Sequence, residues 1–194
     1  CAAIGTRDSV RAGLQAFADR TGVDEIIVAS GIYDHAARLR SYAIAAEAAA
    51  LQSIKGCAFA LAAAFSAEVG DFTRFRSGRQ VTAYFGLAPS QRSSGDSVRL
   101  GGVSGAGNAL VRKLAVEGSW CYAAARHQPK LMPRDTGVPL EIRMHGRKGS
   151  ERLLRRREEM LARGVPAAKA NAATAAELVR WLWALGMMCR EGAE

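Results

Sequence analysis

Apolar residues recur at helical spacing through most of this chain, with one short interruption near its start. Residues 5–20 carry apolar positions three or four residues apart, and residues 35–54 are rich in alanine, so both favour helices. Between them, residues 25–30 (EIIVAS) form a β-branched run that suits a buried strand. Residues 1–50 therefore predict helix, strand and helix.

The pattern changes from residue 51 onward. Residues 51–89 predict a helix, a glycine turn, a helix, a loop at residues 70–75 (GDFTRF) and a further helix from Ser77. This outline is typical of a helix-hairpin-helix, in which a glycine turn exposes backbone N–H groups to a DNA phosphate. Gly56 occupies that turn, but Ala58 stands where the second glycine would be. A helical hairpin that only packs is the alternative interpretation.

Small, flexible and cationic residues crowd into residues 84–120. Ser93 and Ser94 lie in a turn-forming SSGD sequence that is flanked by Arg92 and Arg99. A hydroxyl group among guanidinium groups indicates phosphate chemistry. This stretch is therefore the candidate working part of the chain.

A second glycine-rich turn follows the serines and leads into a helix predicted over residues 108–126. Arg112 and Lys113 lie near the start of this helix. Its N-terminal N–H groups and partial positive charge are expected to face the same space as the serines. A small β-hairpin is expected around residues 97–103.

The last third of the chain predicts a loop and two helices. Residues 126–140 hold three of the five prolines and predict a loop. Residues 151–164 predict a charged helix with four arginines within six positions, and residues 167–188 predict an apolar helix that carries Trp181 and Trp183. The arginine run either tracks a nucleic-acid backbone or forms a solvated face paired with glutamates of its own helix. The tryptophans, two positions apart, cannot share a helix face, so one is expected in the core.

These patterns predict a mainly α fold: a helix-hairpin-helix-like domain over residues 51–194 with a small β-hairpin, preceded by a short helix-strand-helix segment over residues 1–50. The 27 basic and 18 acidic residues give a formal net charge of +9. Residues 1–50 hold five arginines against six acids, so the excess lies entirely in residues 51–194. Such an excess favours polyanionic partners.

Neither a membrane segment nor a metal site is expected. The longest apolar runs are about nine residues, well short of the roughly 20 that a membrane helix needs. The four cysteines are widely and irregularly spaced, which does not suit a zinc site. The chain begins with Cys1 and shows no secretory leader, so we expect an internal fragment of a cytoplasmic protein.

Residues 4–47 resemble the last repeat of the luciferase-like, flavin-dependent monooxygenases, which are β/α barrels. The resemblance rests on GTRDSVRAGL, DEIIVAS and YDHAARLRSYAIAAE in that order. One βα unit leaves its strand without neighbours, whereas a barrel closes only when every strand is paired on both sides. A monooxygenase activity is therefore not expected of this segment alone.

Residues 51–190 resemble the C-terminal domain of the DEDD-type insertion-sequence transposases. GDFTRFRSGRQ, FGLAPS, SSGD, GG-x-S-x-AGN and LVRKL stand in the order and spacing of that family. Members pair a RuvC-like N-terminal domain with a serine-bearing C-terminal domain. The resemblance implies a DNA transposition function.

In that family the serine before the glycine of SSG is the proposed nucleophile, which here implies Ser94 rather than its neighbour Ser93. Arg92, Arg99 and Arg112 are candidates for charge stabilisation because they are close to it in sequence. The residues expected to contact DNA are Gly56, Arg74, Arg76, Arg79, Lys113, Arg155, Arg156 and Arg157.

The resemblance also implies partners and a metal. Family members act on DNA, use a guide RNA and assemble as homo-oligomers, so a nucleoid-associated bacterial protein is expected. The family's magnesium ions are held by four carboxylates of the RuvC-like domain, and residues 1–50 supply no matching set, so no cofactor is expected in this chain. We expect a truncated domain that is inactive alone. The alternative is a non-enzymatic nucleic-acid-binding module.

Overall fold

The structure is a computed structural model that describes residues 34–94, 97–123, 132 and 137–191. The chain divides into two compact units, residues 1–39 and residues 40–194. In the first unit the side chain of Asp34 accepts a hydrogen bond from the Ala37 N–H (2.6 Å) at the start of a helix. The helix predicted at residues 5–20, the strand predicted at 25–30 and most of the monooxygenase-like segment lie outside the described residues.

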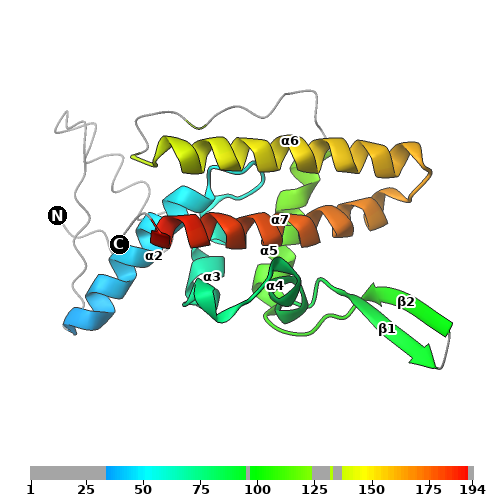
Figure 1. The fold of residues 1–194 in the computed structure, drawn as a ribbon, viewed down its shortest axis with the longest axis horizontal. Helices are drawn as coiled ribbons and strands as arrows, with labels where there is room; N and C mark the ends of the chain where they lie inside the picture. The colour runs from blue at the N-terminus through cyan, green and yellow to red at the C-terminus, as the bar shows by residue number, and fades with distance from the viewer. Residues whose placement is uncertain (1–33, 95–96, 124–131, 133–136, 192–194) are drawn as a thin grey trace, which may run out of the picture. The chain divides into compact units, whose positions relative to one another are not determined.

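The described residues form a mainly α fold with one small antiparallel hairpin, as predicted (Figure 1). The helices are α2 (His35–Leu51), α3 (Phe59–Val69), α4 (Gly78–Tyr84), α5 (Ala109–Ser119), α6 (Leu140–Ala162) and α7 (Ala167–Glu191), with 3-10 turns η1 (Phe72–Arg74) and η2 (Trp120–Tyr122). The strands are β1 (Pro89–Ser94) and β2 (Ser97–Val103). None of the described helices is both long and apolar enough to span a membrane.

Helix α7 lies at the centre of the second unit. It runs antiparallel to α6 and also contacts α4 and α5 (Figure 1). Leu178, Leu182 and Leu185 of α7 are fully buried. Burial of such side chains contributes roughly 1.5–3 kcal/mol each, so this helix carries much of the core. Helices α4 and α5 therefore pack against the antiparallel pair of α6 and α7.

The two tryptophans of α7 pack on opposite sides of that helix, as their spacing requires. The Trp181 ring lies 4.8 Å from the His145 ring of α6, measured between centroids. The Trp183 Nε1–H donates a hydrogen bond to the Phe72 carbonyl oxygen of η1 (3.0 Å). Both side chains are half-buried, so each joins α7 to a different neighbour.

Helix α6 begins at Leu140, eleven residues before the predicted start at residue 151. The added part contains two buried glycines, Gly146 and Gly149, which lower helix propensity. A Cβ atom on Gly149 would lie only 2.8 Å from the Trp181 ring. These glycines therefore permit close packing of α6, and tertiary packing outweighs their poor propensity.

Candidate nucleic-acid interface

The register of the hairpin separates the two serines. Arg92 is the partner of Arg99, Ser94 is the partner of Ser97, and Ser93 is the partner of Val98. Directly opposed residues of an antiparallel pair share a face, and successive residues alternate between faces. Arg92, Ser94, Ser97 and Arg99 therefore share one face of the ribbon, whereas Ser93 lies on the other face.

The same register opposes two cationic residues. Like charges at directly opposed positions disfavour strand pairing. The register thus places one serine and two arginines at positions on the same face of the ribbon, close to its turn.

The base of the hairpin is held by the glycine-rich loop of residues 104–108. The Gly105 N–H donates a hydrogen bond to the Gly86 carbonyl oxygen (3.1 Å), and Gly86 and Gly107 both have positive φ angles, 67° and 72°. A Cβ atom on Gly107 would overlap the Tyr84 carbonyl oxygen. The loop therefore approaches the turn after α4 more closely than residues with side chains would allow.

Arg112 belongs to this base rather than to the serine end. Its Nη1 donates hydrogen bonds to the carbonyl oxygens of Ala106 (2.7 Å) and Phe85 (3.3 Å). Ser94 is five residues along β1 from Pro89, roughly 17 Å at about 3.3 Å per residue. Arg112 therefore contacts backbone at the base of the hairpin, whereas Ser94 lies at the other end of β1.

The start of α5 is capped by a side chain. The Asn108 Oδ1 accepts hydrogen bonds from the N–H groups of Leu110 (2.9 Å) and Val111 (3.2 Å). Asn108 in turn donates to Glu68, which also accepts from the Tyr84 hydroxyl. The two N–H groups expected to face the serines are thus satisfied within the protein. The hydrogen bonds from Tyr84 and Asn108 lower the pKa of the Glu68 carboxyl.

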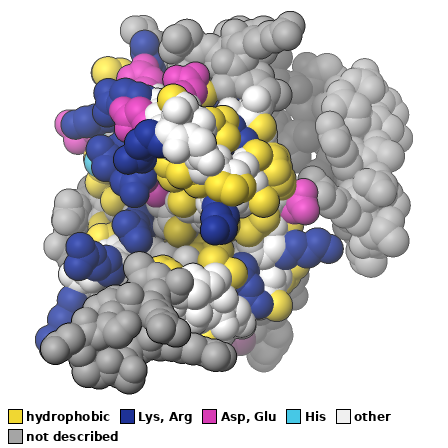
Figure 2. Space-filling model, turned by 90° about the vertical axis from the view of Figure 1, so that its right-hand side faces the viewer, with side chains coloured by type: hydrophobic (Ala, Val, Ile, Leu, Met, Phe, Trp, Pro, Cys, Tyr) yellow, Lys and Arg dark blue, Asp and Glu magenta, His cyan; other side chains and the backbone are white. Residues whose placement is uncertain are grey.

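The arginine run of α6 divides into buried and exposed members. Arg157 is only 5% exposed, so it lies in the interior and its predicted place on a DNA-binding face is corrected. Arg155 and Arg156 are exposed, and they line an open cavity of about 430 Å³. The described residues that line it are Arg152, Arg155, Arg156, Glu159 and Arg163. Figure 2 faces the end of the molecule that carries the α6–α7 turn and the hairpin, and cationic side chains gather on one side of it.

The partners of these arginines come mainly from the neighbouring helix. The Nε atoms of Arg152 and Arg156 contact the Glu177 carboxylate of α7 at 2.7 and 3.1 Å. Arg155 lies 3.9 Å from Glu159 of its own helix. Pairing of the arginines with glutamates of their own helix, the alternative to contact with nucleic acid, therefore describes only the Arg155–Glu159 contact. The two shorter contacts join α6 to α7.

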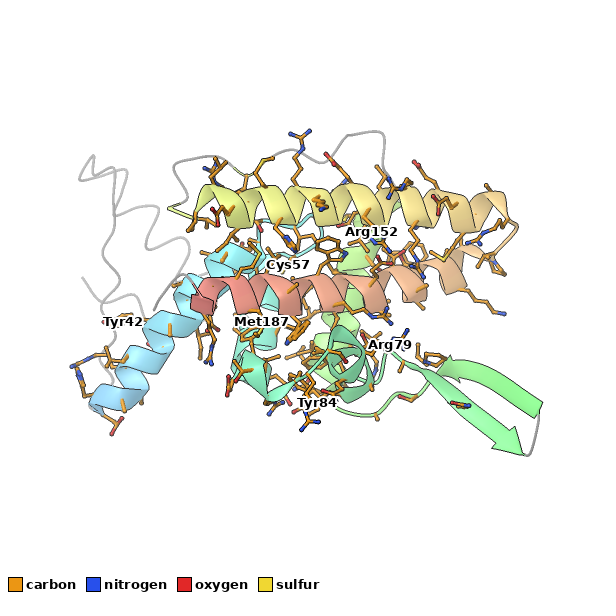
Figure 3. The ribbon with its side chains drawn as sticks, viewed as in Figure 1. Tyr42, Cys57, Arg79, Tyr84, Arg152 and Met187 are labelled. Carbon is orange, nitrogen blue, oxygen red and sulfur yellow. The ribbon has the colours of Figure 1, made fainter. Side chains whose placement is uncertain are left out.

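The remaining predicted DNA-binding residues are scattered over other elements. The Arg74 guanidinium lies 4.6 Å from the ring centroids of both Phe75 and Tyr84, and Figure 3 shows Tyr84 with Arg79 on α4. The side chains of Arg74, Arg76, Arg79 and Lys113 are all exposed.

Gly56 is half-buried and has a φ of 90°. A Cβ atom on it would lie 2.6 Å from the Gly118 carbonyl oxygen of α5. This close approach between two backbones gives the glycine a packing role. It therefore favours the interpretation of residues 51–58 as a turn that packs against α5.

A groove that the sequence did not indicate runs between the base of the hairpin and α7. Its volume is about 570 Å³. Apolar side chains, two glycines and four charged residues line it: Leu87, Pro89, Gly101, Gly102, Val103, Arg156, Lys169, Ala172, Ala173, Ala176, Glu177 and Arg180. Three of the charged lining residues, Lys169, Glu177 and Arg180, belong to the alanine-rich helix α7 and are spaced eight and three positions apart. That spacing is the sequence feature from which the groove could have been predicted.

The described residues do not fit a magnesium centre. Within residues 34–94, 97–123, 132 and 137–191, no three His, Cys, Asp or Glu side chains lie close enough to hold a metal ion.

Comparison with known proteins finds similarity to transposases in the part of the chain around the hairpin. Residues 48–134 match the Transposase IS116/IS110/IS902 family. The chain is 34% identical over 154 residues to the "Putative transposase y4qE" of Sinorhizobium fredii, an alignment that covers 77% of this chain and 39% of that protein. It is 40% identical over 77 residues to the transposase for insertion sequence element IS1111A of Coxiella burnetii, which covers 40% of this chain and 21% of that transposase.

These similarities support an insertion-sequence transposase. The chain spans about two fifths of the length of the Sinorhizobium relative. The family match begins within α2 and includes the hairpin, the glycine-rich loop and α5. The catalytic assignment of the serine, the guide RNA and the monooxygenase-like origin of residues 4–47 stay predictions.

Proposed function

We propose that this chain is the part of an insertion-sequence transposase that binds DNA and presents Ser94 to a DNA phosphodiester. The observation that carries the proposal is the register of the hairpin, in which Ser94 shares a face with Arg92 and Arg99 and Ser93 does not. The family match and the transposase relatives support the DNA substrate.

In the proposed step the Ser94 Oγ attacks phosphorus and forms a serine–phosphate ester bond. The bond between phosphorus and one bridging oxygen of the DNA breaks, and that oxygen leaves as a hydroxyl group after taking up a proton. The serine proton passes to solvent, so the step is a transesterification without oxidation or reduction. Arg92 and Arg99 stabilise the charge on the non-bridging oxygens as it develops.

Binding in this proposal depends on the basic residues of the second unit. The exposed Arg76, Arg79 and Lys113 supply contacts to phosphates that do not depend on sequence. We further propose, from the family resemblance, that a guide RNA selects the target, that the complete protein is a homo-oligomer and that it works at the bacterial nucleoid.

The second candidate function is a nucleic-acid-binding module in which the serine is idle. The contacts of Arg112 favour it, because this arginine donates hydrogen bonds to two backbone carbonyl groups at the base of the hairpin and so has a structural role there. Both functions require an affinity for nucleic acid that falls with salt, but only the first requires chemistry at Ser94.

An electrophoretic shift assay with duplex DNA and structured RNA, repeated from 50 to 300 mM salt, tests the shared requirement. We expect log Kd to rise with log salt with a slope of roughly 3 or more, as four or more phosphate contacts predict. Ser94→Ala should bind as the unaltered chain does, because it removes no charge, and it should form no covalent product with DNA. Absence of binding at 50 mM salt would contradict both functions.

A further inference from the structure

One residue joins two hollows of the second unit. Arg156 of α6 lines both the arginine cavity of about 430 Å³ and the groove of about 570 Å³ at the base of the hairpin. Each volume lies in the range of about 300–1,000 Å³ that binding clefts occupy. The two hollows are therefore neighbouring compartments that one extended ligand can enter.

The arginine cavity suits an anion. Its lining holds four arginines and one glutamate, and Glu177 beneath it neutralises part of that charge. The contacts of Arg152 and Arg156 with Glu177 at 2.7 and 3.1 Å are made through Nε. Their terminal amino groups remain as donors for oxygen atoms of a ligand. Two unmatched positive charges and several N–H donors favour a phosphate group.

The groove has a different chemistry. Leu87, Ala172, Ala173 and Ala176 give it an apolar wall, and Gly101 and Gly102 present only backbone on the hairpin side. Lys169 and Arg180 add cations. A ligand that fits both compartments has an anionic group beside a flat, largely apolar group. A nucleotide, with its phosphate, sugar and base, has that composition.

We infer that the arginine cavity and the groove form one track for a single nucleic-acid strand, which leads from the end of α6 to the base of the hairpin. A phosphate occupies the cavity, and the adjoining sugar and base occupy the groove. This inference rests on the proposed function and adds the site at which the strand flanking the reacting phosphate is held. Because no aromatic ring is among the described residues that line the groove, the track binds without strong base preference.

Glu177 is a positioning residue in this track. Its side chain is only 8% exposed, and its two carboxylate oxygens each contact one arginine, whose side chains are 48% and 49% exposed. The buried carboxylate therefore fixes two guanidinium groups at the entrance of the cavity. Figure 3 shows Arg152 between α6 and α7, where that contact is made.

The charge-reversal test compares two double variants of the full chain. Arg155→Glu with Arg163→Glu changes two exposed residues of the cavity. Arg147→Glu with Lys148→Glu makes the same charge change at two exposed residues in the N-terminal half of α6, outside the cavity lining. The probes are a fluorescent 12-nucleotide oligo-dT and an oligo-U RNA of equal length, titrated by anisotropy over a salt series.

We expect the cavity variant to bind at least tenfold more weakly than the matched control and to lower the salt slope by about 0.7 for each lost phosphate contact. A loss for oligo-dT alone assigns the track to DNA, and a loss for oligo-U alone assigns it to RNA. If the unaltered chain binds steeply with salt but the two double variants bind alike, the track is refuted while the proposed function stands. If the unaltered chain binds neither probe nor duplex DNA, the proposed function fails as well.

Glu177→Gln gives an independent measurement. The substitution removes a negative charge, so a purely electrostatic effect would tighten binding of the 12-nucleotide probes. Loss of positioning instead predicts binding several-fold weaker, because Arg152 and Arg156 are released from their fixed orientation. Circular dichroism and the melting temperature confirm that the variant is folded. Tighter binding by a folded Glu177→Gln would overturn the positioning role.

Discussion

Two glycines of the loop at the hairpin base allow a matched substitution experiment. Gly105 and Gly107 have nearly equal φ angles of 71° and 72°. A Cβ atom on Gly105 meets nothing within 4 Å, whereas one on Gly107 would overlap the Tyr84 carbonyl oxygen. Both Gly→Ala changes carry the same backbone strain of about 1–2 kcal/mol, so their difference isolates the close packing of the loop.

The size of that difference follows from what the loop must give up when it moves. Relief of the overlap moves the loop away from the turn after α4. The loop then gives up the hydrogen bond that its Ala106 carbonyl accepts from Arg112, which also donates to Phe85 of that turn, and the bond from the Gly105 N–H to the Gly86 carbonyl. A hydrogen bond from a charged donor contributes about 1.5–3 kcal/mol and one between neutral groups about 1 kcal/mol. We therefore expect Gly107→Ala to lower the free energy of unfolding by about 2–4 kcal/mol more than Gly105→Ala.

Urea unfolding followed by far-ultraviolet circular dichroism and tryptophan fluorescence measures both values. Gly102→Ala serves as a further control, because Gly102 lacks a positive φ and its Cβ would meet nothing within 4 Å, so its effect should stay within about 0.5 kcal/mol. Equal destabilisation by Gly105→Ala and Gly107→Ala, within about 0.5 kcal/mol, would refute the argument that the loop is held by backbone contact.

Three other properties can be measured on the same protein. Replacing both Arg152 and Arg156 by Ala leaves the buried Glu177 carboxylate unpaired, so we expect the free energy of unfolding in urea to fall by about 3 kcal/mol. An added Glu177→Ala should restore most of that stability, and additive losses would contradict the pairing. Hydrogen bonds lower the pKa of Glu68 in the folded state, so their stabilisation is present above the unfolded pKa of about 4.3 and is lost as pH falls. The free energy of unfolding should therefore drop more steeply below about pH 5 in the unaltered chain than in Glu68→Gln. Parallel pH curves for the two proteins would exclude this contribution of Glu68. Burial raises the pKa of the Cys57 thiol, so this thiol should resist Ellman's reagent at pH 8 until urea unfolds the protein, and rapid labelling of native Cys57 would argue against the packing.

Several features of the fold were predictable because local chemistry and tertiary packing agree. Ser77 caps α4 through a hydrogen bond from the Gln80 N–H, and the apolar periodicity of residues 167–188 matches α7 closely. The SSGD sequence was predicted as a turn, and the strands end at Ser94 and begin again at Ser97 on its two sides. In each case the signal lies within a few residues of the element that it specifies.

Other features depend on residues far apart in the chain, and sequence patterns did not reveal them. The start of α6 was missed because Gly146 and Gly149 weaken a helix that packing against other elements restores. Arg157 was grouped with its exposed neighbours because three consecutive arginines carry no local sign of which one faces inward. Glu177, twenty-one positions after Arg156, could be identified as its partner only when α6 and α7 were folded together.

The central claim is that Ser94, and not Ser93, reacts with a DNA phosphodiester. Because the chain alone is expected to be inactive, the most direct test joins it to the N-terminal part of the Sinorhizobium fredii relative that it lacks. The joined protein is incubated with DNA whose scissile bridging oxygen is replaced by sulfur, so that the departing thiol cannot reverse the reaction, and the covalent adduct is mapped by peptide mass spectrometry. The account predicts an adduct on Ser94 that is retained in Ser93→Ala and absent from Ser94→Ala. An adduct on Ser93, or DNA binding without any adduct in the joined protein that keeps both serines, would contradict it.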